Sequence, residues 1–240
     1  GQGVTPTAYA THLHQYISRG MEAFLSALDI TGSPHQQRVI TIATTPAMGA
    51  LLMPGLASAL KPTFPQILLH NIAIVDAARQ LDQRQVDLLI DTHLHSGQAI
   101  SHHVLYQDRV QMYCRAGHPA LDGPQDETTL AEYEFALLLP EGQRYPTLHR
   151  RLQEEMGERR CGFSTFNLMT QAAMIAGSDM LGLTTERLFA MVSRLWPLQT
   201  LDFPSLGGEQ IDVALHFNKL SGKEPLLKEI IETVIRSFKA

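Results

Sequence analysis

The sequence is poor in cysteine and in clustered positive charge, and these two absences exclude several kinds of protein. Its two cysteines, Cys114 and Cys161, allow at most one disulfide and are too few for a four-cysteine zinc site, so we expect two reduced core thiols. Lysine and arginine number 19 against 24 acidic residues, which gives a net charge of −5. Such a chain lacks the clustered cations that hold a nucleic-acid backbone, so we do not expect residues 1–240 to bind DNA by themselves.

Long apolar runs and a secretion signal are also absent. The longest apolar stretches, residues 47–56 and 135–140, are far shorter than the roughly 20 residues that span a bilayer. The first residues lack the charged and then apolar order of a signal peptide, so we expect a cytoplasmic protein with no membrane contact. The composition is nevertheless 44% apolar, which is enough for a large core and excludes a disordered or fibrous chain.

Histidine is plentiful, with 11 residues, and it is where a catalytic or metal-binding interpretation would begin. His93, His95, His102 and His103 lie in one polar stretch, and imidazoles at such spacing can bind zinc. Zinc sites usually add cysteine or carboxylate ligands in a fixed geometry. Solvated loop histidines are therefore the favoured interpretation, and a metal site is the alternative.

The short motifs of common enzymes are missing. We find no His-Glu-x-x-His pair, no Gly-x-Ser-x-Gly turn and no phosphate-binding loop of the Walker type. Gly1 and Gly3 have no third glycine at the required spacing and follow no predicted strand, so they do not form a dinucleotide-binding loop. The sequence thus predicts no catalytic residue, no cofactor and no metal, and an enzyme is the weaker hypothesis.

The first segment, residues 9–28, has the pattern of an amphipathic helix. Residues 5–7 offer a cap and a helix-compatible proline before it, and residues 31–34 end it and start a linker. Apolar side chains recur at helical spacing and form one apolar face, which we expect to pair with the same helix of a second chain. The predicted oligomerisation residues are Leu13, Ile17, Met21, Phe24 and Leu28.

Beyond residue 33, short strands alternate with helices. Residues 38–44 (RVITIAT) alternate β-branched side chains as a strand does, and a helix over 46–60 begins at a proline. Further strands are predicted at 66–71, 86–91, 104–116, 135–139, 162–165, 180–183, 198–203 and 211–217, and further helices at 76–83, from a cap at 128–129, and at 145–156, 167–176, 186–195 and 224–238. This alternation predicts an α/β fold whose sheet is parallel and covered by helices on both faces.

Several segments, in this order, resemble those of LysR-type transcriptional regulators. Residues 1–7 resemble the Gly-x-Gly-x-x-Pro-Thr run that closes the family's winged helix-turn-helix, and the helix after them resembles its linker helix. Residues 38–44 and 85–90 resemble the first and third strands of its effector-binding domain. Residues 117–121 (GHPAL) resemble its Gly-His-Pro turn, and residues 176–184 resemble its glycine-containing segment before the return to the first subdomain. Order and spacing together make the resemblance specific over essentially the whole chain.

The resemblance implies a fold of two Rossmann-like subdomains, like type 2 periplasmic binding proteins, preceded by a long linker helix. Residues 1–33 would be the end of the helix-turn-helix region and the linker helix, and residues 34–240 the effector-binding domain. Subdomain I would comprise about 38–95 and 204–240, and subdomain II about 104–198. Within the family the sequence is most similar to YbeF-like members, in the subgroup of LeuO.

The resemblance also implies the partners. It implies that the DNA-reading domain is missing from this chain, so that DNA is bound only through that domain. The chain itself is expected to form a homodimer or homotetramer and to bind a small-molecule effector. A free-standing solute-binding protein of the same fold is the alternative, but it would carry a secretion signal and lack the helix at 9–28.

The effector is expected at two strand-to-helix turns. In open α/β sheets, ligands bind beyond the carboxyl ends of strands, where helix amides point at them and favour a carboxylate. The alternatives are that the threonines and the serine are ordinary helix caps, that the histidine lies in a loop, and that the phenylalanines lie in the core. Thr92 and His93, which directly follow the third predicted strand, are expected to mark the hinge between the subdomains. The predicted effector-binding residues are Thr44, Thr45, Pro46, Thr92, His93, Phe163, Ser164, Thr165, Phe166 and Asn167.

Overall fold

The computed structural model describes residues 7, 9–10, 13–14, 16–18, 20–21, 38–138, 160–203 and 209–238. The chain divides into two compact units, residues 1–38 with 66–68 and residues 39–65 with 69–240. In the first unit, every described residue from 9 to 21 is helical, and the Thr7 hydroxyl caps this helix by accepting from the Ala10 amide at 3.1 Å. The N-terminal helix is thus confirmed over its described part, whereas Phe24 and Leu28 lie outside the described residues.

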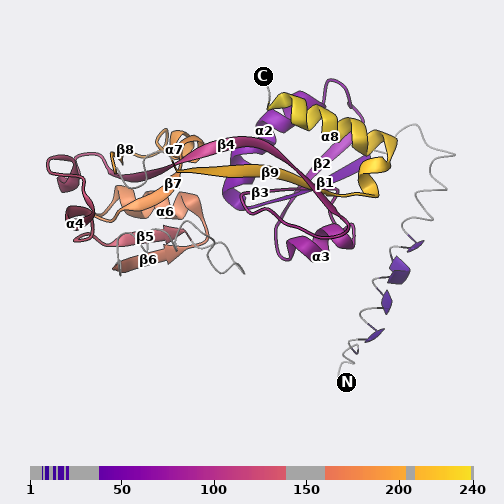
Figure 1. Cartoon of the computed structure of the whole chain (residues 1–240), viewed down its shortest axis with the longest axis horizontal. Coiled ribbons are helices and arrows are strands. Elements are labelled where there is room, and N and C mark those ends of the chain that lie inside the picture. The colour runs from indigo at the N-terminus through magenta and orange to yellow at the C-terminus, as the bar shows by residue number, and fades with distance from the viewer. Residues whose placement is uncertain are drawn as a thin grey trace, which may run out of the picture. The chain divides into compact units, whose positions relative to one another are not determined.

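A seven-stranded sheet carries the rest of the fold (Figure 1). Its strand order is β2-β1-β3-β9-β4-β7, with β8 paired to β4. The strands are β1 (Arg38–Thr44), β2 (Ile67–Ala73), β3 (Leu88–Asp91), β4 (Ile100–Arg115), β7 (Gly182–Thr185), β8 (Leu198–Leu201) and β9 (Gln210–Asn218). β1 and β3 are parallel, but β9 is antiparallel to β3, and β4 is antiparallel to β7, β8 and β9. The prediction of a wholly parallel sheet was therefore wrong, because local alternation does not show the direction in which β4 and β9 pair.

A second, two-stranded sheet pairs β5 (Phe135–Leu138) in parallel with β6 (Cys161–Thr165). Cys161 is exposed in this small sheet, so the prediction that both cysteines lie in the core holds only for the buried Cys114. The reason is that β6 begins at Cys161 and leaves its first two residues open to solvent. The helix predicted at 145–156 lies outside the described residues.

The described helices beyond the first unit are α2 (Pro46–Leu60), α3 (Ala77–Asp82), α4 (Glu127–Leu130), α6 (Leu168–Ala176), α7 (Glu186–Val192) and α8 (Pro225–Ser237), with short 3-10 helices η1 (Pro119–Leu121) and η3 (Ser221–Lys223). α4 is capped by Asp126, whose Oδ1 accepts from the Thr129 amide at 2.9 Å, and not by Thr128 or Thr129 as predicted. Asp126 is the cap because its carboxylate directly precedes the first turn and reaches the amide of the third residue of the helix. Across the described residues, no helix has the length and apolar character needed to cross a membrane.

α2 begins and ends at the predicted residues, and its buried face explains why it forms. Met48, Leu52, Leu56 and Leu60 are buried at steps of four residues, which places them on one side of the helix. α2 packs against α8, whose own buried residues Leu227, Ile230, Ile231 and Val234 recur at helical spacing. Each fully buried aliphatic side chain of this kind contributes about 1.5–3 kcal/mol relative to exposure, so the packing of this helix pair stabilises α2.

β4 is the strand that links the two ends of the larger sheet. Its residues 100–109 pair with β9, and its residues 110–115 pair with β7 and β8. Figure 1 shows β4 and β9 as two long arrows side by side. Val110, Met112 and Cys114 alternate along its second half and pack into one apolar core with Leu183 and Leu201. A single strand therefore contributes to both ends of the sheet.

Candidate functional site

The turn between β1 and α2 is the first predicted contact for the effector. Thr44 ends β1 and is only 1% exposed, and its Oγ1 lies 2.9 Å from Nδ2 of Asn71, which also donates to the Ile42 carbonyl at 2.9 Å. Thr45 is the N-cap of α2, and its Oγ1 accepts from the Met48 amide at 3.4 Å. No acidic residue lies in the first turn of α2, so the positive end of the helix dipole has no local carboxylate to neutralise it.

A glycine allows this turn to be as tight as it is. A Cβ added to Gly49 would lie 2.7 Å from Oδ1 of Asn71 and 2.8 Å from Oγ1 of Thr44. Both distances are too short for a real side chain, so the first turn of α2 approaches β1 and β2 more closely than any other residue would permit. The Thr44–Asn71 hydrogen bond and Gly49 together fix the position of the α2 N-terminus.

The turn between β6 and α6 is the second predicted contact. Asn167 is the N-cap of α6, and its Oδ1 accepts from the amides of Met169 at 2.8 Å and Thr170 at 3.3 Å. Oγ1 of Thr165 accepts from the Asn167 amide at 3.2 Å. α6, like α2, has no acidic residue in its first turn. The second turn therefore also presents an uncompensated helix N-terminus.

The side chains beside this second turn are more open. Ser164 is exposed, and its hydroxyl makes no hydrogen bond to any residue in the described part of the chain. Phe166 is 52% exposed, whereas Phe163 packs against a core formed by Tyr113, Ala136 and Ile175. The structure therefore uses Phe163 largely as core and leaves Phe166 and Ser164 open to solvent.

The structure brings the helices of these two turns into contact. α2 contacts α6 and also α7, so the two predicted turns begin helices that touch each other. Thr92 and His93 directly follow β3, and both are exposed. The Thr92 amide donates to Oδ1 of Asp91 at 2.7 Å, and the ring of His93 meets the ring of His95 edge-on at 4.8 Å. Their described partners are thus Asp91 and His95.

A cluster of histidines around β9 was not predicted. Nε2 of His95 lies 2.8 Å from Oδ2 of Asp91, and the His95 amide donates to Nε2 of His216 at 3.1 Å. The ring of His102 lies 5.8 Å from that of His216. His102 and His103 are on β4, which begins at Ile100, so the prediction that they are loop residues was wrong. They form a strand because they pair in register with His216 and Leu215 of β9.

Burial determines the protonation of this cluster. His216 is fully buried, and its Nδ1 has no hydrogen-bond partner among the described residues. Burial, together with the neighbouring His95 and His102, lowers the pKa of His216 to about 4, so the ring is neutral at neutral pH. In the described part of the chain, no three histidine, cysteine or carboxylate side chains are arranged to hold a metal ion. No signal in the sequence marks His216, because an alternating strand pattern fits a histidine at an inward position as well as an outward one.

Comparison with known proteins then decides the family. Residues 33–239 match the LysR substrate binding domain. The chain belongs to this family. It is 47% identical over 238 residues to the uncharacterized HTH-type transcriptional regulator YbeF of Escherichia coli K12, a match that covers 99% of this chain and 75% of YbeF.

Solved structures of other regulators share its fold. A probable transcriptional regulator from Pseudomonas aeruginosa superposes with a TM-score of 0.76 at 18% identity, over 98% of this chain and 80% of that one. The regulatory domain of CrgA, a LysR-type regulator from Neisseria meningitidis, superposes with a TM-score of 0.64 at 13% identity, over 84% of this chain and 99% of that one. The predicted fold class and the predicted function, the effector-binding part of a LysR-type regulator, are confirmed.

Proposed function

We propose that this chain senses a small carboxylate between the β1–α2 and β6–α6 turns and passes the signal on as part of an oligomeric transcriptional regulator, without enzymatic activity. The observation that carries the proposal is the charge at the helix N-termini. α2 and α6 touch each other and have no acid in their first turns, whereas α4 and α7 begin with Glu127 and Glu186. An anion near both free N-termini is favoured by each helix, by about 0.3–1 kcal/mol where exposed.

The residues of the two turns have different roles in this proposal. The Thr45 hydroxyl and the backbone amides after it would hold the carboxylate from one side, and the Ser164 hydroxyl from the other. Asn167 and Thr165 hold the second turn in shape through the hydrogen bonds to the backbone of α6. Thr44 and Pro46 fix the first turn, Phe163 and Phe166 provide apolar surface, and Thr92 and His93 mark the hinge.

Calorimetry with a panel of small carboxylates tests this site. Thr45→Ala and Ser164→Ala should each weaken binding about three- to tenfold, the net value of one ordinary hydrogen bond. Ser58→Ala is the matched control, because Ser58 is an exposed hydroxyl near the other end of α2 that only bonds the Pro54 carbonyl. A ligand that binds both turn variants as tightly as it binds the unaltered chain would exclude this site.

The N-terminal helix supports a second part of the proposal, self-association. Leu13, Ile17 and Met21 are 44%, 57% and 55% exposed and recur at helical spacing. An apolar face of this kind is costly in water, and the same face of a second copy would cover it. We therefore propose a homodimer, or a homotetramer built from it, and the sequence predicts that Phe24 and Leu28 take part in the same contact.

Sedimentation of a double variant tests the self-association. Replacing Leu13 and Ile17 by Asp should shift the chain toward monomer, because two carboxylates in an apolar contact cost more than the contact provides. His14→Asp adds one such negative charge to the helix at an exposed position beside the apolar face and should leave the mass unchanged. An unchanged mass in the double variant would mean that the helix does not hold the copies together.

The remaining predictions are finer than the family assignment. We propose the two subdomains at about 38–95 with 204–240 and at about 104–198, which is supported by β4 pairing with β9 in its first half and with β7 and β8 in its second. We place the regulator in the cytoplasm and its DNA contact outside the residues matched to YbeF, because its family acts on transcription. Its place in the subgroup of LeuO stays a prediction.

A further inference from the structure

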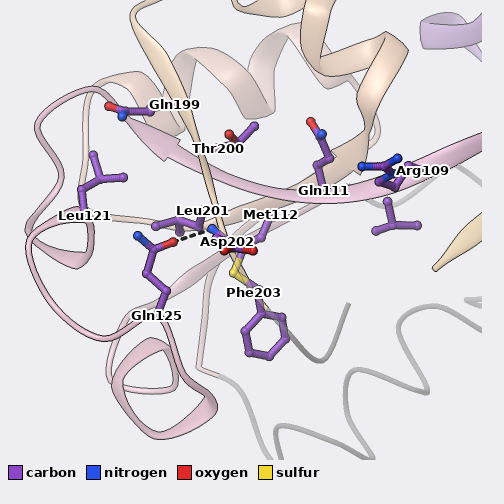
Figure 2. Close-up of a pocket in the computed structure, with 11 residues that line it drawn as sticks. Arg109, Gln111, Met112, Leu121, Gln125, Gln199, Thr200, Leu201, Asp202 and Phe203 are labelled. Carbon is purple, nitrogen blue, oxygen red and sulfur yellow. Dashed lines mark hydrogen bonds between the residues drawn. The ribbon is translucent and has the colours of Figure 1, made fainter. Parts of the chain in front are cut away.

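A polar cavity of about 410 Å³ lies beside the second half of β4, where β8 ends (Figure 2). Its volume is in the range of small-molecule sites, about 300–1,000 Å³. None of its lining residues belongs to the two turns discussed above. The lining residues come from β4, from the segment around η1 and from β8 with the two residues after it: Arg109, Val110, Gln111, Met112, Leu121, Gln125, Gln199, Thr200, Leu201, Asp202 and Phe203.

Three polar side chains of this cavity share one face of the sheet. Arg109 and Gln111 are two residues apart on β4, so their side chains leave the strand on the same side. Thr200 of β8 pairs with Tyr113, the next residue on that side, and therefore lies on the same face. Figure 2 shows Thr200, Gln111 and Arg109 on one side of the β4 ribbon and Phe203 on the other.

Two of these polar groups have unused binding capacity. Arg109 is exposed, and its guanidinium makes no ion pair or hydrogen bond within the described part of the chain. Oε1 of Gln111 is buried and has no hydrogen-bond partner there, and neither has the buried hydroxyl of Thr184, which lies opposite Gln111 on β7. A buried acceptor without a partner is unfavourable, so a ligand that donates to Gln111 would remove a penalty as well as add a contact.

The rest of the cavity limits what the ligand can be. Met112 and Leu201 pair with each other on the face of the sheet opposite Arg109 and Gln111, and with Phe203 they are buried in the apolar core on that side. The Asp202 amide donates to the Gln125 side chain, which holds the end of β8 against the segment before α4. In Figure 2, Gln125 and Leu121 lie at the end opposite Arg109. The ligand must therefore be small and polar, and an oxyanion on it would lie at the Arg109 end, because Asp202 also lines the cavity.

We propose that this cavity is a second small-molecule site, which binds a carboxylate carrying a hydrogen-bond donor beside it, as in a hydroxy acid or an amino acid. The planar carboxylate pairs with the Arg109 guanidinium, whose paired N–H groups match its geometry. The neighbouring O–H or N–H donates to Oε1 of Gln111. The site is independent of the turns at α2 and α6.

Saturation-transfer NMR tests the site with defined probes. Lactate and L-serine carry the donor beside the carboxylate, and acetate is the probe that lacks it. We expect saturable binding of lactate or serine at millimolar concentrations, tighter than that of acetate. Arg109→Met should weaken it about tenfold by removing the charge, and Gln111→Met should reduce it to the affinity of acetate. The control is Arg236→Met, because Arg236 is a surface arginine on α8, and it should leave binding unchanged.

The same measurements show how the proposal fails. Absence of saturable binding of both donor-bearing probes to the unaltered chain would overturn it. Binding that is lost in Thr45→Ala but kept in Arg109→Met would assign the probe to the β1–α2 turn, which would support the proposed function and overturn the second site. Arg109 is exposed, so Arg109→Met should fold normally, and it decides the question even if Gln111→Met is unstable.

Discussion

The two predicted effector turns differ in how firmly the protein holds them. β1 is buried over most of its length, and the turn after it is held by the Thr44–Asn71 hydrogen bond and by the close approach at Gly49. β6 belongs to a two-stranded sheet and has no fully buried residue, and Ser164 beside its turn makes no hydrogen bond within the described residues. One turn is therefore built as part of a core, and the other is held mainly by its own helix cap.

If both turns bind the proposed effector, this difference predicts a different role for each of them. A turn fixed by buried contacts loses little freedom when a ligand binds, so it can set the position of the carboxylate. A turn held by fewer contacts can adjust and close on the ligand. A ligand can shift such an equilibrium only by the difference in its affinity for the two arrangements. Changes in the first turn should consequently alter stability, and changes in the second turn should mainly alter binding.

The largest expected effect is the acid sensitivity of the sheet that carries the first turn. His216 lies on β9, which is separated from β1 only by β3, and its pKa is lowered from 6.5 to about 4. Below pH 6.5 the unfolded chain binds this proton and the folded chain does not, so stability should fall by about 3 kcal/mol as the pH drops toward 4. Urea unfolding across this range measures the slope.

A neutral replacement isolates this effect. His216→Gln should unfold more easily at neutral pH, because an amide fits the buried position less well, but its stability should change less between pH 6.5 and about 4. His70→Gln removes an exposed histidine on β2 and should keep the slope of the unaltered chain. Equal slopes for His216→Gln and the unaltered chain would show that another group carries the acid sensitivity.

The second effect concerns two glycines in one helix. Gly49→Ala should cost about 2 kcal/mol, because the added methyl group would displace the hydrogen-bonded side chains of Thr44 and Asn71. Gly55→Ala should be neutral or stabilising by up to about 1 kcal/mol, since nothing lies within 4 Å of its added Cβ and alanine favours helices. Thermal unfolding of both variants measures the difference. Similar melting temperatures would mean that the first turn is less tightly held than its geometry indicates.

The sequence predicted those parts of the fold that depend on neighbouring residues. The bounds of β1 and α2 agree with the structure because an alternating strand, a threonine cap and a proline follow one another within a short segment. Asn167 at the start of α6 and Gly177 at its end are local signals of the same kind. The family was recognisable for a related reason, because it depended on short motifs in a fixed order.

Features made by distant residues could not be predicted in this way. His95 and His216 are 121 residues apart in sequence, and only the antiparallel placement of β9 beside β3 brings them together. The hydrogen bond that the Thr44 hydroxyl accepts likewise depends on Asn71 of β2. The polar cavity forms where β8 ends against β4, which is a consequence of pairing and not of local pattern.

A smaller effect is expected at the cap of the second turn. Asn167→Ala removes the acceptor of two amide hydrogen bonds at the start of α6, which should cost about 1 kcal/mol. Asn167→Asp keeps the acceptor and should retain most of the stability, but its negative charge would repel a carboxylate ligand. Urea unfolding and calorimetry on both variants separate the two roles. A carboxylate that binds Asn167→Asp as tightly as the unaltered chain would contradict the proposed site.

The smallest effect on stability is expected for Ser164→Ala. Its hydroxyl is exposed and has no described hydrogen bond, so its loss should change the free energy of unfolding by less than about 0.5 kcal/mol. The same variant should weaken carboxylate binding severalfold, because the open turn uses this hydroxyl only when the ligand is present. Thr45→Ala should lower the free energy of unfolding and also weaken carboxylate binding, since Thr45 also caps α2. Thermal unfolding with and without ligand measures the two quantities on one sample. A Ser164→Ala chain that is clearly destabilised without ligand would show that the second turn, like the first, is held by contacts of its own.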